Sequence, residues 1–287
     1  MNLLKEGILQ QAVVKTTLTR KLTVDGLTKP YPVYKVRLDW LFYNDQNDRI
    51  ATWISQYKAQ HDGKAPNSSD KEAYNAIIEQ FIVESNPDAI RKTQTNIEMD
   101  DQREPGVVLA DGRIIDGNRR FTCLRRLATK NDRFGYFETV ILDRNIENSA
   151  KQIKMLELSI QHGEESKVDY NPIDRLVGIY NDIISTHLLS IEEYAKSTNE
   201  PETEVKKRVE IAKLMVEFLE FINAPEQFYI ARDLQMYFPL EELMKLLKKC
   251  KAEDEAEDLK ITAFTNILMQ TSTDMGRFIR NIKAVIG

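Results

Sequence analysis

The residues with the clearest potential for chemistry stand at a glycine turn in the middle of the chain. Two β-branched residues at positions 114 and 115 predict a strand that ends at Asp116-Gly117, and an arginine-rich helical pattern follows at once. The first backbone N–H groups of a helix lack intrahelical partners, so a helix that starts at such a turn can bind an anion. Gly117 would let the backbone approach a ligand, and the planar forks of Arg119 and Arg120 match phosphate geometry.

Positive charge is concentrated around this turn. Between positions 113 and 133 the chain has seven basic and two acidic residues, whereas the formal net charge of the whole chain is −5. The pattern is consistent with a phosphate site, but a glycine turn followed by a solvated arginine face is also common at protein surfaces. Asp116 has two interpretations as well, because it could be a turn residue or a general base near a bound phosphate.

The segment from Asp116 to Ala128, DGNRRFTCLRRLA, resembles the G-E-R-R box of the ParB/sulfiredoxin-like superfamily. Gly117, Asn118, Arg119 and Arg120 match the box position by position, with Asn118 in place of the usual glutamate. The resemblance implies that these four residues bind the phosphates of a nucleoside triphosphate, CTP or ATP, together with Mg²⁺.

Further segments extend the resemblance over about residues 31 to 222. Residues 44–49 are similar to the family's N-P-x-Q-P-R segment, without its two prolines. Residues 169–174, DYNPID, resemble the D-L-N-P-I-E that opens the helical part of ParB proteins. A proline after an asparagine cap has a mechanical role at the start of a helix.

The chain departs from the family where magnesium and triphosphate are held. ParB proteins have an E-N-x-x-R segment there, whereas residues 157–163 of this chain read ELSIQHG and contain no Glu-Asn pair. Glu157, Glu164 or Glu165 could supply carboxylate oxygens for magnesium instead. Asp116, Glu164 and Glu165 are the candidates for a catalytic role. We therefore expect nucleotide binding more than hydrolysis, and a weak CTPase-like activity stays open.

Periodicity predicts an α+β protein in which a small mixed-sheet domain of the ParB/sulfiredoxin-like type precedes an all-α helical domain. We expect an N-terminal arm or short hairpin over 1–30, the nucleotide-binding domain over 31–165, and the helical domain over 166–287. Strands are predicted near 31–38, 107–109, 113–115 and 137–142, and helices near 50–57, 69–84, 150–160, 173–184, 205–219 and 240–247. Ser69 with Glu72 predicts a capping box, and the five acids in residues 251–258 predict an exposed loop or a frayed end.

Residues 190–216 resemble a helix-turn-helix pair. Ser190 and Glu193 fit a capping box, and Pro201 fits the start of the second helix. The cations that could contact DNA phosphates are Lys206, Lys207, Arg208 and Lys213. Such a pair is also frequent in helical bundles that do not bind DNA, and the next candidate is the basic face around Arg125, Arg126 and Lys130.

Composition narrows the class of protein. Hydrophobic residues make up 42% of the 287 residues and charged residues 30%, which is typical of globular domains. No apolar run is long enough for a membrane span, and the two cysteines favour a reduced, cytoplasmic protein. We expect Cys123 to be a small core residue more than a nucleophile. No carboxylate cluster typical of a metal-dependent nuclease is visible in the sequence.

These features predict a ParB-like nucleotide-binding protein that is associated with DNA, in partition, regulation or mobile-element maintenance. Bound nucleotide would gate binding to DNA or to a protein, and a homodimer is a further candidate assembly. Two alternatives stay open. One is a phosphoryl-transfer enzyme of the ATP-dependent serine-kinase type, and the other is a helical interaction module with a vestigial nucleotide site.

Overall fold

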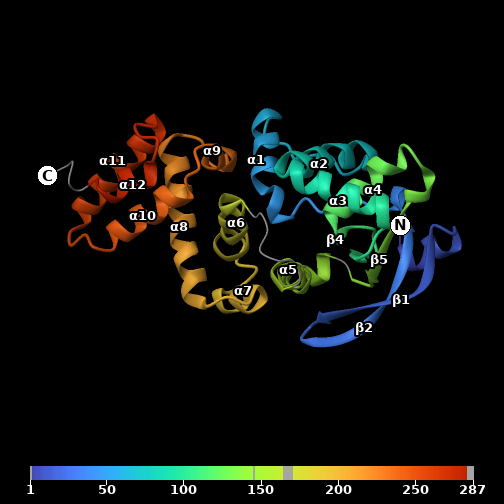
Figure 1. The fold of residues 1–287 in the computed structure, drawn as a ribbon. Helices are drawn as coiled ribbons and strands as arrows, with labels where there is room; N and C mark the ends of the chain where they lie inside the picture. Colours follow the sequence, from blue (N-terminus) through green and yellow to red (C-terminus); the bar gives the residue numbers. More distant parts are fainter. Residues whose placement is uncertain (1, 145, 164–170, 283–287) are drawn as a thin grey trace. The chain divides into compact units, whose positions relative to one another are not determined.

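The structure is a computed structural model that describes residues 2–144, 146–163 and 171–282 (Figure 1). The chain divides into two compact units, each of which is built from several segments. The first unit consists of Met1–Ile50, Pro66–Asp169 and Glu193–Asn199, and the second of Ala51–Ala65, Tyr170–Glu192 and Glu200–Gly287. All described strands belong to the first unit, and the second is helical. The predicted α+β fold class is confirmed.

The first unit is built on a mixed sheet, which has five strands within the described residues. The strands are β1 (Val13–Val24), β2 (Leu27–Arg37), β3 (Gly106–Leu109), β4 (Ile114–Asp116) and β5 (Tyr136–Leu142). Their order is β1-β2-β5-β3-β4. The pair β3–β5 is parallel and the other pairs are antiparallel. The sheet therefore brings β4, which leads into the arginine-rich helix, to one edge.

The N-terminal residues form a long hairpin that is part of this sheet. Strands β1 and β2 pair from Val13↔Val36 to Val24↔Leu27. The turn between them is Asp25-Gly26, with φ of 53° and 76°. Two positive φ values suit a two-residue hairpin turn, so this Asp-Gly signal in the sequence marks the turn correctly. Of the arm and the hairpin expected for residues 1–30, the structure has the hairpin.

Apolar side chains cover one face of the sheet beneath helix α5 (Ile146–Gly163). Ile153, Leu156 and Ile160 recur at helical spacing and pack on the strands. The strand residues in this cluster are Leu22, Val24, Val33, Val107, Leu109, Ile115, Val140 and Leu142. Burial of this cluster fixes both the hairpin and β4 against α5.

Helices α2 (Lys71–Ser85), α3 (Pro87–Asp100) and α4 (Asn118–Ala128) lie on the other side of the sheet from α5 (Figure 1). An aromatic chain joins α4 to the sheet, since the Phe121 ring centroid lies 6.0 Å from that of Phe137 and 4.8 Å from that of Tyr43. The Tyr43 hydroxyl lies 2.8 Å from the Thr122 hydroxyl on α4. Short turns complete this unit: η1 (Leu3–Gly7), η2 (Leu38–Trp40), η3 (Asp48–Ile50) and η4 (Asp132–Phe134).

The helix starts in this region differ from the sequence prediction. The predicted capping box with Ser69 is wrong, because the Asp70 carboxylate accepts hydrogen bonds from the Glu72 and Ala73 N–H groups. Asn86 is the C-cap of α2, and its side chain also caps α3 by accepting from the Ala89 N–H. Pro87 is the first residue of α3, where a missing N–H costs nothing. The sequence analysis therefore missed α3.

The second unit is all helical over its described residues. It contains α1 (Ala51–Gln60), α6 (Pro172–Ile179), η5 (Tyr180–Ser185), α8 (Glu202–Phe221), α9 (Phe228–Asp233), α10 (Tyr237–Leu247), α11 (Glu253–Met269) and α12 (Met275–Arg280). Helix α7 (Ile191–Thr198), of which residues 193–198 belong to the first unit, and α8 form where the helix-turn-helix pair is predicted, and Pro201 caps α8. Among the described residues we find no helix with the length and apolar character that crossing a bilayer requires.

The acidic stretch 251–258 is a second correction. It was expected to be an exposed loop or a frayed end, but α11 begins at Glu253 and has three acids in its first turn. Negative side chains are favourable at a helix N-terminus, because the helix dipole is positive there. The acids that looked like a loop signal are therefore a helix-start signal.

We predict that Gly106→Ala destabilises the first unit. A Cβ at this position would lie 2.3 Å from Phe137 Cζ and 2.7 Å from the Asp116 carbonyl oxygen, so β3 or β4 would have to shift. Such overpacking costs about 1–3 kcal/mol. Gly276→Ala is the matched control, since the nearest atom to a Cβ there is 3.6 Å away. Urea unfolding followed by circular dichroism should show a loss for Gly106→Ala alone, and equal stability of the two variants would contradict the packing described.

Candidate functional site

A pocket of ≈ 260 Å³ in the first unit surrounds the start of α4. It brings the 117–120 segment together with residues from η3, α2, α3 and α5. Its lining consists of Asn47, Arg49, Ile50, Ile82, Ser85, Asn86, Thr93, Glu104, Ile115, Asp116, Gly117, Asn118, Arg119, Arg120 and Gln161. Two segments that the sequence analysis singled out separately, 44–49 and 117–120, therefore contribute to one site.

The start of α4 requires a glycine. Gly117 is the N-cap with φ 99° and ψ 20°, in the left-handed region that side chains disfavour. A Cβ there would also lie 2.8 Å from Phe137 Cζ. No side chain among the described residues caps the first turn of α4. The helix start thus keeps the donor groups and the positive end of the dipole that an anion would meet.

Asp116 is held between two arginines, beside this helix start. Its Oδ2 accepts hydrogen bonds from Arg20 Nη1 at 2.8 Å and from Arg120 Nη2 at 3.0 Å. The Asp116 side chain is 7% exposed, and those of Arg20 and Arg120 are 10% and 17% exposed. The same guanidiniums donate to backbone carbonyls, Arg20 to Pro105 and Arg120 to Glu104, each at 2.6 Å. We call Arg20, Asp116 and Arg120 the carboxylate clamp.

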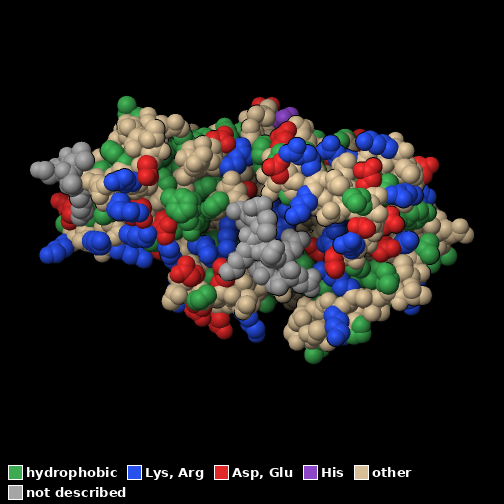
Figure 2. Space-filling view, viewed as in Figure 1, with side chains coloured by type: hydrophobic (Ala, Val, Ile, Leu, Met, Phe, Trp, Pro, Cys, Tyr) green, Lys and Arg blue, Asp and Glu red, His purple; other side chains and the backbone are tan. Residues whose placement is uncertain are grey.

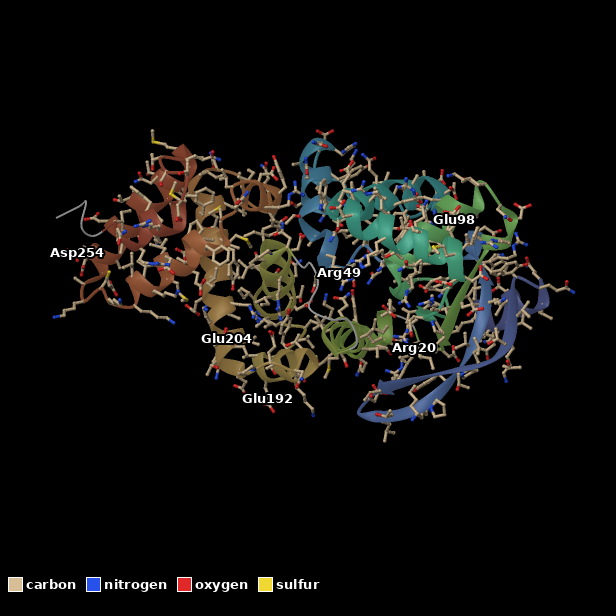
Figure 3. All side chains as sticks on the ribbon, in the orientation of Figure 1. Arg20, Arg49, Glu98, Glu192, Glu204 and Asp254 are labelled. Carbon is tan, nitrogen blue, oxygen red and sulfur yellow. The ribbon has the colours of Figure 1, made fainter. Side chains whose placement is uncertain are left out.

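The clamp changes the interpretation of two predicted site residues. Asp116, a candidate catalytic base, directs one carboxylate oxygen at two cations, an arrangement that favours a structural role. Arg120, a predicted phosphate ligand, lines the pocket but is bound to Asp116 and to the 104–105 backbone. Sequence analysis missed Arg20 (labelled in Figure 3), which lies 96 residues from Asp116 and belongs to no local motif.

Arg49 and Arg119 add further positive charge to the pocket lining. Arg49, labelled in Figure 3, comes from η3, and Arg119 from the first turn of α4. Asn118 contributes a polar acceptor, because its Oδ1 is buried without a hydrogen-bond donor among the described residues. Buried acceptors are nearly always satisfied, so a bound group or a water is needed to supply the donor. The described lining therefore offers a ligand the cations Arg49 and Arg119 and, in Asn118 Oδ1, a buried acceptor without a donor among the described residues.

A buried ion pair holds the segment that leads to Arg49. Lys154 Nζ on α5 lies 2.6 Å from Asp48 Oδ1 and 3.4 Å from the Gln46 carbonyl oxygen. Both side chains are less than a tenth exposed. Breaking such a pair costs about 3–5 kcal/mol, because the remaining charge is left buried. The pair therefore fixes η3, and with it Arg49, against α5.

Of the three candidate metal ligands, Glu157 lies within the described residues. Glu157 is 2% exposed, and its carboxylate lies 4.0 Å from Lys154 Nζ and accepts from Gln161 Nε2 at 3.1 Å. Glu164 and Glu165 lie outside the described residues. Over the part of the chain that the structure describes, no group of three or more His, Cys, Asp or Glu side chains could hold a metal ion.

Cys123 is a core residue, as expected. Its side chain is fully buried, and its Sγ lies 3.6 Å from the Ile90 carbonyl oxygen of α3. Burial raises the pKa of the thiol to about 12. Because the thiolate is the reactive form, this environment does not suit a nucleophile.

The four predicted DNA-contacting cations all lie on α8 and all form ion pairs. Lys206 pairs with Glu202 at 3.0 Å, Lys207 with Glu241 at 2.5 Å, Arg208 with Glu200 at 2.8 Å, and Lys213 with Glu210 at 3.0 Å. The hydrogen bond to the Glu241 carboxylate raises the pKa of Lys207. The positive charge of this face is thus largely balanced within the helical unit.

The second candidate DNA-binding surface, around Arg125, Arg126 and Lys130, has ion pairs at only one of its three cations among the described residues. Arg125 is held by Glu72 and Glu79, each at 2.9 Å, and its guanidinium lies over the Phe121 ring. Arg126 and Lys130 are exposed and form no ion pair with any described residue. This face is therefore a smaller cationic surface than the sequence suggests.

Of the comparisons with known proteins, the one with solved structures finds similar proteins. No protein-family model and no curated protein matches this chain. A Pnob8-like ParB-N domain is 11% identical, with a TM-score of 0.42 over 88% of this chain and 93% of that chain. A C-terminally truncated chromosome-partitioning protein ParB from Caulobacter crescentus, complexed to the centromeric parS site, is 11% identical, with a TM-score of 0.38 over 67% and 87%. Both structures are of ParB proteins.

We predict that Asp116→Asn lowers the free energy of unfolding by about 3–5 kcal/mol, because both buried arginines lose their carboxylate. Asp111→Asn is the matched control. Asp111 accepts from the Arg113 N–H, an interaction that asparagine retains, and its side chain is 40% exposed. The control should change stability by less than about 0.5 kcal/mol. Chemical denaturation measures both, and an Asp116→Asn variant as stable as the control would rule out the clamp as a structural centre.

Proposed function

We propose that this chain is a ParB-like protein that binds a nucleoside triphosphate, CTP or ATP, at the start of α4. The observation that supports the proposal is the uncapped, glycine-led helix start in a pocket lined by Arg49 and Arg119. Phosphate oxygens accept hydrogen bonds from the first N–H groups of a helix, and the helix dipole adds a favourable field. Arginine forks bind phosphates through two parallel hydrogen bonds. The site therefore suits a polyanionic ligand.

The three arginines of the lining would have different tasks. Arg119 and Arg49 would contact phosphates directly. Arg120 would act mainly through position, because its guanidinium is already bound by Asp116 and by the Glu104 carbonyl oxygen. Loss of Arg120 would thus disturb the fold of the site as well as its charge.

Magnesium would accompany the triphosphate, and we tested the carboxylates of the lining for this role. Mg²⁺ prefers carboxylate oxygens and keeps several waters. The Asp116 carboxylate fits poorly, because two guanidiniums already surround one of its oxygens. Glu104 lines the pocket, is exposed, and forms no ion pair with a described residue, so it fits better. Bound magnesium would balance phosphate charge at that side of the pocket.

The arrangement favours binding over turnover. A kinase of the serine-kinase type needs a carboxylate that can accept the substrate proton. Asp116 is the candidate closest to the box, and its position between Arg20 and Arg120 disfavours that role. We therefore place the phosphoryl-transfer alternative second, and the helical interaction module with a vestigial site third.

Association with DNA is the second part of the proposal. The similar Caulobacter crescentus protein was solved complexed to the parS site. The formal net charge of −5 means that any DNA contact must come from a local cationic surface. Bound nucleotide would regulate this association, and a second copy of the chain or another protein is the alternative partner.

We predict that Arg119→Ala weakens binding of CTP or ATP by about tenfold or more, because it removes a charge-assisted contact of about 1.5–3 kcal/mol. Arg126→Ala is the matched control, with the same charge change on an exposed position of the same helix. Isothermal titration with magnesium should show the loss for Arg119→Ala alone, and melting temperatures establish that both variants are folded. Equal affinities would mean that the start of α4 does not bind the phosphates.

We also predict slow hydrolysis. Phosphate release from CTP, ATP and GTP should stay near background, with or without DNA. The reason is that Asp116, the carboxylate next to the start of α4, is held between Arg20 and Arg120. Robust multiple turnover would contradict this prediction. In that case Glu104→Gln, Glu164→Gln and Glu165→Gln would identify the acid that holds the metal.

A further inference from the structure

One face of α10 combines an exposed aromatic ring with a row of cations. Phe238, Glu242, Lys245 and Lys249 are spaced by four, three and four residues, so they lie on the same side of the helix. The helical turn continues past Leu247, because the Lys249 N–H donates to the Leu246 carbonyl oxygen. Phe238 is 64% exposed, which is unusual for a large aromatic side chain.

The acid on this face is neutralised, and the neutralising contacts bring in α12. The Glu242 carboxylate accepts from Arg280 Nε at 2.9 Å and from Lys245 Nζ at 2.8 Å. The hydrogen bond from Arg280 makes the largest contribution and that from Lys245 the next. Together they lower the pKa of Glu242 to about 2. Arg280 is thereby held beside α10, and Arg277 is exposed one turn earlier on α12.

Four cations near this face form no ion pair with a described residue: Lys248, Lys249, Lys251 and Arg277. All four are exposed. This is the reverse of α8, where each predicted DNA contact is paired with a glutamate. Figure 2 shows Lys and Arg side chains gathered over the region that holds α10 and α12 in Figure 1. The acidic first turn of α11, from Glu253 onward, bounds this surface.

A groove of ≈ 650 Å³ runs beside the aromatic ring, between α10 and the segment that includes α12. Phe238, Arg277 and Arg280 line it, and so do three acids, Asp233, Glu242 and Asp274. A flat group could stack on the Phe238 ring while an attached phosphate meets either arginine. Stacking of bases on an aromatic ring beside cations that contact the phosphates is the general mode of binding of single strands, and here the lysines Lys248 and Lys249 lie outside the groove lining.

We propose that the surface formed by Phe238, Lys245, Lys248, Lys249, Arg277 and Arg280 binds single-stranded DNA. Unpaired bases stack on Phe238, and backbone phosphates meet the cations along α10 and α12. A duplex fits less well, because its bases are stacked on each other and cannot reach the ring. This inference deepens the DNA association proposed above and does not depend on the nucleotide pocket. With three unpaired cations in this surface, Lys248, Lys249 and Arg277, log affinity should fall with log salt with a slope of about −2, at about 0.7 per phosphate neutralised.

The test is the fluorescence anisotropy of a labelled oligo-dT strand titrated with the full chain. Lys248→Glu with Lys249→Glu should weaken binding about tenfold or more. Lys206→Glu with Lys213→Glu is the matched control, because it makes the same charge change at two exposed positions of α8. This control should stay within about twofold of the parent, since both lysines are already paired.

A second pair of variants isolates stacking from charge. Phe238→Ala should weaken binding about fivefold or more, which is the lower end of the loss expected for one stacked base. Phe221→Ala is the control, as a phenylalanine of the same unit that is 45% exposed and lies outside the groove lining. Far-ultraviolet circular dichroism and melting temperature establish that all variants are folded.

Three results would overturn the proposal: a parent that does not bind oligo-dT, equal losses in the two charge-reversal pairs, or a duplex of equal length that binds as tightly as the single strand. The nucleotide proposal is tested separately. Lys248→Glu with Lys249→Glu should keep the parent affinity for CTP or ATP, and a parent without nucleotide affinity would leave the oligo-dT result unaffected.

Discussion

The Asp116 carboxylate, shared by Arg20 and Arg120, is the interaction on which the first unit depends. It joins the N-terminal hairpin, the end of β4, the first turn of α4 and the backbone at residues 104 and 105. A buried carboxylate is costly unless it is paired, and here one acid meets two guanidiniums. The clamp therefore holds the helix start in place and leaves one excess positive charge at the pocket wall. With Arg49 and Arg119 in the same lining, the pocket is suited to anions.

Local signals in the sequence predicted the parts of this site but not their connection. The strand ending at Asp116, the glycine turn and the box helix are encoded within about a dozen residues and were predicted correctly. The Asp25-Gly26 turn could also be predicted, because a two-residue hairpin turn of this kind needs positive φ at both residues and Asp-Gly favours it. Arg20 could not be assigned, since its partner lies 96 residues away and an arginine in a strand has no distinguishing local pattern. Helix α3 was missed for a related reason: Asn86-Pro87 both ends one helix and starts the next.

Charge balance is the property that the sequence predicts least, because it depends on which acids lie beside which cations. Lys206, Lys207, Arg208 and Lys213 look like a basic helix face, but a sequence does not show which glutamates come within reach. Glu241, which pairs with Lys207, is 34 positions further along the chain. The acids at 253–258 were misjudged in the opposite direction, because they complement the dipole of α11. The surface beside Phe238 emerged only when paired and unpaired cations could be distinguished, and this surface leads to the proposal of a single-strand site.

The central claim is that the first turn of α4 receives the phosphates of a nucleotide. The most direct measurement is a titration of the ¹⁵N-labelled, deuterated protein with CTP or ATP and magnesium, followed by amide chemical shifts. We expect the largest shifts at the Asn118 and Arg119 amides, with a smaller shift at Arg49, all saturating at one nucleotide concentration. Nucleotide binding that leaves the Asn118 and Arg119 amides unshifted, with changes concentrated in the helical unit, would contradict the claim.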